Sequence, residues 1–182
     1  MFLDLAKAFD CVDHAILLKK LTGYGICGGV HSWLKSFLCG RTQQVVFKGN
    51  LSSKGPITVV VPQGSILGPL FFSIYVNDLP NAVSTSDIRM FADDTELHYC
   101  HGDLSTVQCT LQADLENISV WLRVNRLKLN VSRSHCMLIG LRQRIGGKCL
   151  HLLLNGDTLR QVSSTKYLMV FISISILLGI LT

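Results

Sequence analysis

Two adjacent aspartates, Asp93 and Asp94, follow directly on an apolar run, and no other feature of the sequence restricts the fold as strongly. The apolar members of this run, Ile88, Met90, Phe91 and Ala92, predict a buried strand. Adjacent like charges at the end of such a strand repel each other and are costly to desolvate. Asp4 also follows a short apolar run, residues 1–3, which predicts the end of a second strand. The fold must therefore offset the charge of carboxylates at two strand ends.

The overall composition predicts one folded domain with faces that meet a partner. The chain has 182 residues, of which 48% are hydrophobic and 16% charged, and its mean hydropathy is +0.38. Such a chain can bury a sizeable core, and its low charge indicates apolar faces that pack against another domain. The 17 Lys and Arg outnumber the 12 Asp and Glu. The resulting charge of +5 fits a polyanionic partner and equally fits plain solubility.

The seven cysteines and the apolar C-terminus indicate an intracellular protein without a stable membrane association. The cysteines are odd in number, scattered, and include no CxxC pair, which argues against a disulfide framework and against structural zinc. Residues 167–182 carry no charge over 16 residues. This run is shorter than the roughly 20 apolar residues that span a bilayer, so we expect a buried strand or an aberrant tail there.

Hydrophobic periodicity predicts an α+β domain with a mainly antiparallel sheet. Helices are expected at residues 14–25, after an Asp13 cap, and at 30–38, 65–76 and 104–122. Strands are expected at residues 1–5, 41–49, 56–61, 88–92, 95–101, 135–140 and 150–162. Turns are expected at residues 50–55 and, within the last strand segment, at Asn155-Gly156. No repeat or low-complexity linker marks a domain boundary.

The aspartates have two interpretations on these grounds. If the two acidic strands are neighbours, Asp4, Asp93 and Asp94 converge at one edge, and divalent cations with oxygen ligands, such as Mg²⁺, would supply the missing counter-charge. Two such ions catalyse in-line phosphoryl transfer. In the alternative interpretation, Asp4 and Asp10 cap helices and Asp93-Asp94 forms a hairpin turn.

Further motifs carry a resemblance to a known family. The segments DLAKAFDCVDH, PQGSILGPL, NDLP and FADDTELH occur in that order. Together they resemble the palm of reverse transcriptases, above all those of non-LTR, LINE-type retrotransposons. WLRVNRLKLNVSRSHCMLIG and LNGDTLRQVSSTKYL resemble the segments that follow in the same family. The resemblance implies a polymerase-type palm over residues 1–168, with a mainly antiparallel sheet backed by helices and truncated at both ends. Residues 169–182 form a divergent apolar tail.

The resemblance also implies an RNA-directed DNA polymerase that joins deoxynucleotides to a primer 3′-hydroxyl by two-metal catalysis. Asp4, Asp93 and Asp94 match its catalytic carboxylates. Asp4 and Asp93 would bind two Mg²⁺ (or Mn²⁺) ions with help from the Leu5 carbonyl, and Asp94 would contact metal less directly. The implied partners are an RNA template, a DNA primer and deoxynucleoside triphosphates.

Four further residues match positions that contact the substrate. Phe9 falls where a bulky ring excludes the 2′-hydroxyl of a ribonucleotide, although it is equally a plain core phenylalanine. Gln63 and Gly64 match residues beside the sugar and the template base, although Gly64 also suits an ordinary turn. Arg133 stands where the family often has a lysine that protonates pyrophosphate, and arginine does not give up its proton near neutral pH. His135 replaces a common acidic residue.

The resemblance leaves competing functions open. The fingers and thumb that accompany this palm are not recognisable in the sequence, so we expect this chain alone to extend no primer. The alternative to a polymerase is an inactive retrotransposon remnant that binds nucleic acid or another protein. A metal-dependent phosphohydrolase is disfavoured, because the sequence has no histidine cluster near the carboxylates.

Overall fold

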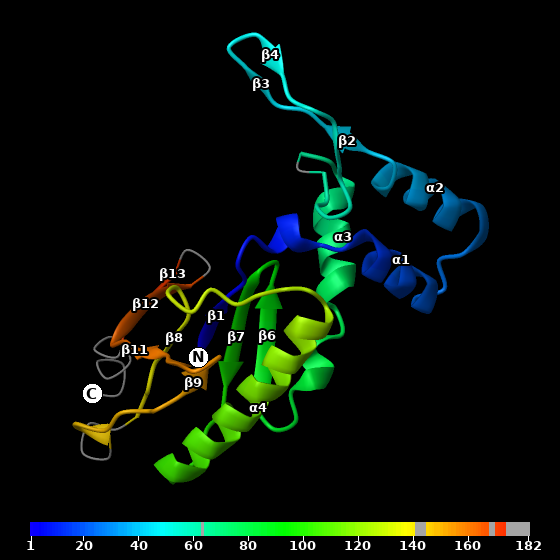
Figure 1. Cartoon of the computed structure of the whole chain (residues 1–182). Helices are drawn as coiled ribbons and strands as arrows, with labels where there is room; N and C mark the ends of the chain where they lie inside the picture. Colours follow the sequence, from blue (N-terminus) through cyan, green and yellow to red (C-terminus); the bar gives the residue numbers. More distant parts are fainter. Residues whose placement is uncertain (63, 141–144, 168–169, 174–182) are drawn as a thin grey trace. The chain divides into compact units, whose positions relative to one another are not determined.

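The computed structural model describes residues 1–62, 64–140, 145–167 and 170–173. Runs of helices and runs of strands follow one another along the chain, as is typical of the predicted α+β class (Figure 1). The helices are η1 (Ala8–Cys11), α1 (His14–Gly23), α2 (Gly28–Leu38), α3 (Leu67–Val76), η2 (Leu79–Ala82) and α4 (Leu104–Val124). The strands up to the hairpin that carries Asp93 and Asp94 are β1 (Phe2–Asp4), β2 (Thr42–Gln43), β3 (Val46–Phe47), β4 (Asn50–Leu51), β5 (Gly55–Pro56), β6 (Asp87–Phe91) and β7 (Asp94–His98). The later strands are β8 (His135–Cys136), β9 (Leu153–Leu154), β10 (Asp157–Thr158), β11 (Arg160–Gln161), β12 (Ser164–Tyr167) and β13 (Val170–Ser173).

The chain forms two compact units. The sheet unit contains residues 1–6, 79–123 and the chain from 128 onward, and the helix–ribbon unit contains residues 7–78 and 124–127. The chain passes between the units several times, so their boundary does not fall in one linker. This explains why the composition of the sequence marks no boundary.

The sheet unit is built on a five-stranded sheet in the order β11-β8-β1-β7-β6. Every pairing in it is antiparallel except β11 with β8, which confirms the predicted, mainly antiparallel sheet. Side chains alternate between its two faces. Leu3, Thr95 and Leu97 are buried on one face, whereas Asp4 and Asp94 belong to the other, more open face.

Helix α4 has the apolar stripe that the sequence predicts, and it is drawn in front of β6 and β7 in Figure 1. The buried members of the stripe are Val107, Leu111, Leu115, Ile118 and Leu122. Asp103 precedes the helix, and its carboxylate accepts a hydrogen bond from the backbone N–H of Thr106 at 2.9 Å. The cap and the 3.6-residue period together define this helix.

The last part of the chain agrees with the prediction at the Asn155-Gly156 turn and differs from it in the length of its strands. Asn155 and Gly156 form the turn between β9 and β10, and both have positive φ, at 54° and 92°. Strand β8 is shorter than the expected 135–140, and β12 pairs with β13 in the apolar tail. The remainder of that tail, residues 174–182, lies outside the described residues. Within the described part of the chain, no helix has the length and apolar character needed to cross a membrane.

In the helix–ribbon unit, α1 begins where the sequence predicts. The Asp13 carboxylate accepts hydrogen bonds from the backbone N–H groups of Ala15 and Ile16 at 2.9 and 3.0 Å. Helices α1 and α3 pack on each other, and their largest buried side chains are Leu17, Leu21, Phe71, Phe72 and Tyr75. This apolar pair of helices is the core of the unit.

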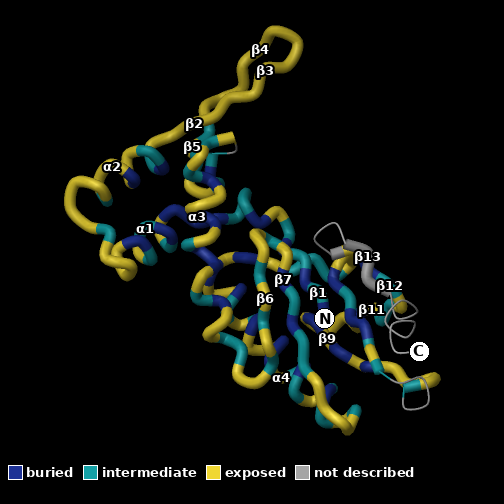
Figure 2. Tube along the Cα trace, turned by 180° about the vertical axis from the view of Figure 1, so that it is seen from behind, coloured by how far each residue is buried: buried dark blue, intermediate teal, exposed yellow. Residues whose placement is uncertain are grey.

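The turn expected at residues 50–55 is wrong, because the chain already turns before Asn50. Strands β3 and β4 pair through a two-residue turn at Lys48-Gly49, with φ of 48° and 80°, so Asn50 lies in a strand. The segment 56–61 contributes only the end of β5 and an isolated bridge from Val59 to Asp13. A two-residue turn with both φ positive matches the twist of a hairpin better than a longer loop. Figure 2 shows this ribbon exposed along its length.

Candidate active site

Asp4 and Asp94 are direct cross-strand neighbours in the sheet unit. They are the last pair of the antiparallel β1–β7 ladder. Met1 and Leu97 exchange both backbone hydrogen bonds, at 2.7 and 2.9 Å, so hydrogen-bonded and non-hydrogen-bonded pairs alternate from there. Asp4 and Asp94 therefore stand at a non-hydrogen-bonded pair, where Cα atoms are about 4.5 Å apart and side chains are closest.

Asp93 lies beside this pair in the turn that joins β6 to β7. Ala92 and Asp93 form the turn, and Ala92 has a left-handed backbone with φ 52°. The strand before the turn is correctly predicted, but its expected burial is wrong, because Phe91 is 65% exposed. Phe91 pairs with Asp94 and belongs to the open face of the sheet, so its ring is available to a ligand there. The sequence gives no sign of this exposure, since an apolar run suits a buried strand equally well.

The charges at this edge disfavour one another. Partial burial raises the pKa of Asp94, and the neighbouring carboxylates of Asp93 and Asp4 raise it further. A directly opposed pair of like charges destabilises an antiparallel ladder. The expected gathering of three carboxylates is therefore present as an electrostatic cluster at one end of β1 and β7.

A polar turn holds the end of β1 in place. The backbone N–H of Asp4 donates to Ser134 Oγ at 3.1 Å, and the Asp4 carbonyl accepts from the N–H of Asn130 at 2.8 Å. Ser134 Oγ in turn donates to the Asn130 carbonyl at 2.9 Å, and the Ser134 side chain is 2% exposed. Sequence reasoning missed this support, although an Asn and two serines after a strand are a signal for a turn.

The Leu5 carbonyl faces the β7 edge of the strand. Leu5 forms an isolated bridge with Leu129. The hydrogen bonds of this bridge run from the Asn130 N–H to the Asp4 carbonyl and from the Ala6 N–H to the Lys128 carbonyl. Because successive carbonyls alternate between the two edges of a strand, the Leu5 carbonyl points to the opposite side, one residue beyond the Asp4–Asp94 pair.

Arg133 and His135 follow the same turn. The backbone N–H of Arg133 donates to the Asn130 carbonyl at 3.2 Å, and its guanidinium is exposed. It forms no ion pair with a residue in the described ranges. His135 contacts the Arg133 carbonyl through Nδ1 at 2.9 Å and Thr165 Oγ1 through Nε2 at 2.6 Å. The ring is thus held within the sheet unit by a backbone carbonyl and a threonine hydroxyl.

The other substrate-contacting candidates belong to the helix–ribbon unit, where Phe9 and Gly64 line one cavity of about 540 Å³. Phe9 is half-buried, and one face of its ring packs against Phe72 with centroids 4.5 Å apart. Gly64 has φ 80°, which favours glycine, and a Cβ there would meet no atom within 4 Å. Ser65 Oγ accepts from the N–H of Leu67 at 3.1 Å, at the start of α3. Gln63 lies outside the described residues.

Comparison with known proteins decides the family. Residues 1–172 match the model of the family described as "Reverse transcriptase (RNA-dependent DNA polymerase)". The chain belongs to the reverse transcriptase family. The resemblance that the palm motifs carry is thereby confirmed.

The reverse transcriptase relatives include retrotransposon proteins of insects. The RNA-directed DNA polymerase from mobile element jockey of Drosophila melanogaster is 32% identical over 92% of this chain and 19% of its own length. The probable RNA-directed DNA polymerase from transposon X-element of the same species is 32% identical over 79% of this chain and 16% of its own length. A Pol polyprotein from retrotransposable element R2 of Popillia japonica is 32% identical over 42% of this chain and 13% of its own length. The chain thus spans about a fifth or less of these relatives.

Reverse transcriptases generally use divalent metal ions, and the donors at the Asp4 edge suit them chemically. Carboxylate and carbonyl oxygens are the ligands that Mg²⁺ and Mn²⁺ prefer. Partial burial and, after it, the charges of Asp93 and Asp4 raise the pKa of Asp94. In the part of the chain that the structure describes, however, no three His, Cys, Asp or Glu side chains converge into a preassembled metal site. The edge offers oxygen donors of the kind that these ions prefer, without a preassembled site among the described side chains.

Proposed function

We propose that this chain supplies the catalytic carboxylates of an RNA-directed DNA polymerase. The observation that carries the proposal is the direct cross-strand pairing of Asp4 with Asp94, next to Asp93 in the adjoining turn. Three carboxylates at one sheet edge repel one another and need nearby positive charge to offset that repulsion. A pair of divalent ions and the phosphates they bind would satisfy that need in a reverse transcriptase.

Asp4 and Asp93 are the residues that would hold the ions, with the Leu5 carbonyl as a neutral ligand. Bound metal would activate the primer 3′-hydroxyl and neutralise charge on the departing pyrophosphate. The Ser134 and Asn130 hydrogen bonds fix the backbone of Asp4, so its carboxylate starts from a defined position. Asp94 adds negative charge beside the ions without having to bind them directly.

Phe9, Gln63, Gly64 and Arg133 are proposed to contact the nucleotide. The cavity that Phe9 and Gly64 share falls within the 300–1,000 Å³ range of ligand pockets. Because Phe72 packs against one face of the Phe9 ring, that ring is held in place and can exclude a 2′-hydroxyl sterically. The exposed guanidinium of Arg133 would neutralise pyrophosphate charge without donating its proton.

The distribution of charge supports an RNA template and a DNA primer as partners. The helix–ribbon unit has eight Lys or Arg and three Asp or Glu. The rest of the chain has nine basic and nine acidic residues, so the net charge of +5 belongs to the helix–ribbon unit. Arg41 lies over the Phe37 ring at 4.8 Å and Lys48 over the Phe47 ring at 5.5 Å. Phe47 is exposed and Phe37 is half-buried. Accessible aromatic rings with adjacent cations are typical of surfaces that bind nucleic-acid strands.

A second candidate function is nucleic-acid binding without catalysis, as in an inactive retrotransposon remnant. The lack of a preassembled metal site among the described side chains favours this alternative. It keeps the basic helix–ribbon unit as a binding surface and makes the carboxylates structural relics.

Primer extension separates the two candidates. The chain, joined to the fingers and thumb of a related reverse transcriptase, would be incubated with an RNA template annealed to a DNA primer, deoxynucleotides and Mg²⁺. The polymerase proposal predicts extension that Asp93→Ala abolishes and that the matched control Asp157→Ala, an exposed residue of β10, retains. Template–primer binding without extension by this joined protein would favour the inactive remnant.

A further inference from the structure

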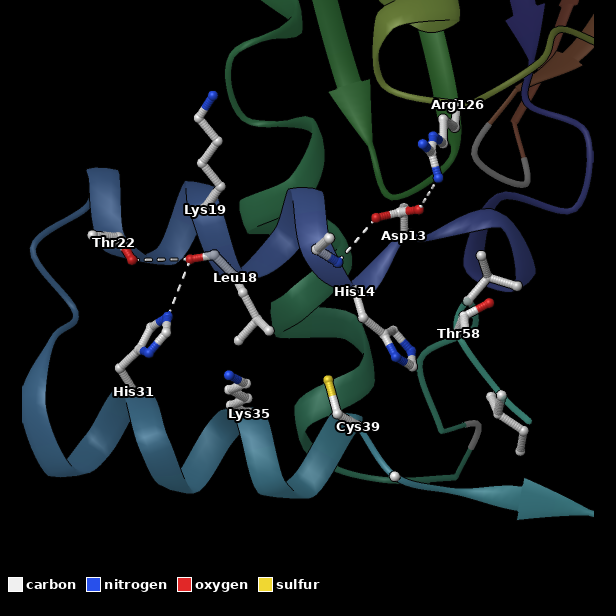
Figure 3. A pocket seen from close by; sticks show the side chains of 14 residues that line it. Asp13, His14, Leu18, Lys19, Thr22, His31, Lys35, Cys39, Thr58 and Arg126 are labelled. Carbon is white, nitrogen blue, oxygen red and sulfur yellow. Dashed lines mark hydrogen bonds and ion pairs between the residues drawn. The ribbon is translucent and has the colours of Figure 1, made fainter.

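A second cavity of the helix–ribbon unit lies between α1 and α2, outside the proposed catalytic and nucleotide contacts. Its volume is about 710 Å³, and it is lined by the two helices, by residues 57–59 and by Arg126. In Figure 3, His31 and Lys35 extend from α2 toward α1, and His14 extends from the first turn of α1 toward the same space. A cavity of this size holds a ligand as large as a nucleotide.

Basic side chains dominate this cavity. Lys19, Lys35 and Arg126 line it, with two histidines, against a single carboxylate, that of Asp13. That carboxylate is already neutralised, because its Oδ2 binds Arg126 at 2.6 Å while its Oδ1 caps α1. Lys35 is exposed and makes no ion pair within the described ranges. The cavity therefore has positive charge that no described protein group offsets.

His14 adds an independent sign of a ligand. Its Nε2 lies 2.8 Å from the Val60 carbonyl, which can only accept, so Nε2 carries the proton. The side chain is buried, at 4% exposure, and its Nδ1 has no hydrogen-bond partner among the described residues. A buried polar atom without a partner is uncommon and calls for an explanation. Nδ1 can accept from a hydroxyl in the neutral ring and donate to an oxyanion in the charged ring.

We propose that this cavity binds a phosphate group, with Lys35 as its main cation and His14 and His31 as polar contacts. Lysine binds phosphate as a point charge. The shared chemistry has two sources, a free nucleotide and the backbone of a nucleic-acid strand. The proposal does not depend on catalysis at the Asp4 edge, since no acidic residue of that edge lines this cavity.

The test is NMR of the histidine rings in the intact chain, which has six histidines. Inorganic pyrophosphate, dATP and a short oligodeoxynucleotide would be titrated separately in EDTA, so that no metal can bridge phosphate to Asp4 or Asp93. We expect the ring signals of His14 and His31 to shift with at least one probe, while those of His98, His101 and His151 stay in place. A response to dATP and pyrophosphate alone identifies a nucleotide site, and a response to the oligonucleotide alone identifies a strand site.

Variants decide whether the shifts come from this cavity. Lys35→Gln removes the proposed cation from an exposed helix position and should weaken binding about tenfold, the effect of losing one charged hydrogen bond. Lys54→Gln is the matched control, because Lys54 is an exposed lysine of the same unit that does not line the cavity. Unshifted His14 and His31 signals with all three probes, or equal binding by Lys35→Gln and the unaltered chain, would overturn the proposal.

Discussion

Asp4 and Asp94 face each other across a non-hydrogen-bonded pair at the end of the β1–β7 ladder, the position where side chains of neighbouring strands are closest. Two carboxylates at such a pair oppose folding of the sheet rather than stabilise it. The sheet tolerates them because they lie on its open face, at the strand ends. Such a pair is unfavourable in a purely structural sheet and is consistent with the cation site proposed above.

Replacing Asp94 with asparagine should stabilise the chain at neutral pH. Burial and the charges of Asp93 and Asp4 raise the pKa of Asp94, so folding disfavours its ionised form. Stability is therefore lost as the pH rises from the unfolded pKa through the folded one. Asp94→Asn should add about 0.5 kcal/mol to the free energy of unfolding at neutral pH.

Urea denaturation at neutral and acidic pH checks this expectation. The gain should vanish below the unfolded pKa of 3.8, where both forms are neutral. Asp157→Asn, at an exposed position of β10, should have little effect at either pH. An Asp94→Asn variant less stable than the unaltered chain at neutral pH would mean that Asp94 is held by favourable contacts.

In the chain joined to the fingers and thumb of a related reverse transcriptase, Phe9→Val should increase incorporation of ribonucleotides in primer extension. The ring has one face against Phe72 and lines the cavity that Gly64 shares, so its removal opens space for a 2′-hydroxyl. Phe72→Leu is the matched control, because it disturbs the same packing from a fully buried position. If both variants lose stability and neither changes sugar discrimination, Phe9 is a core residue only.

Asp114 should be one of the most sensitive residues of α4. It is 1% exposed, and its carboxylate accepts hydrogen bonds from the backbone N–H groups of Ser84 and Ser86, each at 2.8 Å. Burial alone would raise the pKa of Asp114, but these hydrogen bonds outweigh it and hold the pKa below its ordinary value. Asp114→Ala should lower the free energy of unfolding by about 2 kcal/mol at neutral pH, because buried N–H donors lose their acceptor.

The pH dependence of that loss gives a second check. A depressed folded pKa contributes stability above the unfolded pKa, and this contribution disappears as the pH falls through the folded pKa. The difference in melting temperature between Asp114→Ala and the unaltered chain should therefore become smaller at acidic pH. Asn117→Ala, on the exposed side of the same helix, should change little at any pH. A difference independent of pH would contradict the role of the carboxylate charge.

Asp13 should show separable contributions from its two oxygens. Asp13→Ala removes the α1 cap and the Arg126 ion pair, and should cost about 2 kcal/mol of unfolding free energy. Asp13→Asn keeps an acceptor for the cap and should cost about half as much. Equal losses in the two variants, measured by urea denaturation, would assign the whole effect to the ion pair.

The features that the sequence predicts are those with a local signal. The Asn155-Gly156 turn needs two residues with positive φ, and the α4 stripe repeats over five buried apolar positions, so neither depends on distant contacts. Asp114 interrupts that polar–apolar pattern, and its partners lie 28 to 30 residues away, where no spacing rule reaches. The pairing of Asp4 with Asp94 was predictable only on the assumption that their strands are neighbours.

Divalent-cation binding at the carboxylate edge tests the central claim most directly. Mn²⁺ would be titrated into the chain and its free concentration followed by electron paramagnetic resonance, with Asp4→Asn, Asp93→Asn and the control Asp157→Asn in parallel. The two-metal account predicts saturable binding that Asp4→Asn and Asp93→Asn each weaken about tenfold or more, the scale for a lost ionic contact. Asp157→Asn should bind as the unaltered chain does. Equal Mn²⁺ binding by all four proteins, or no saturable binding by the unaltered chain, would contradict it.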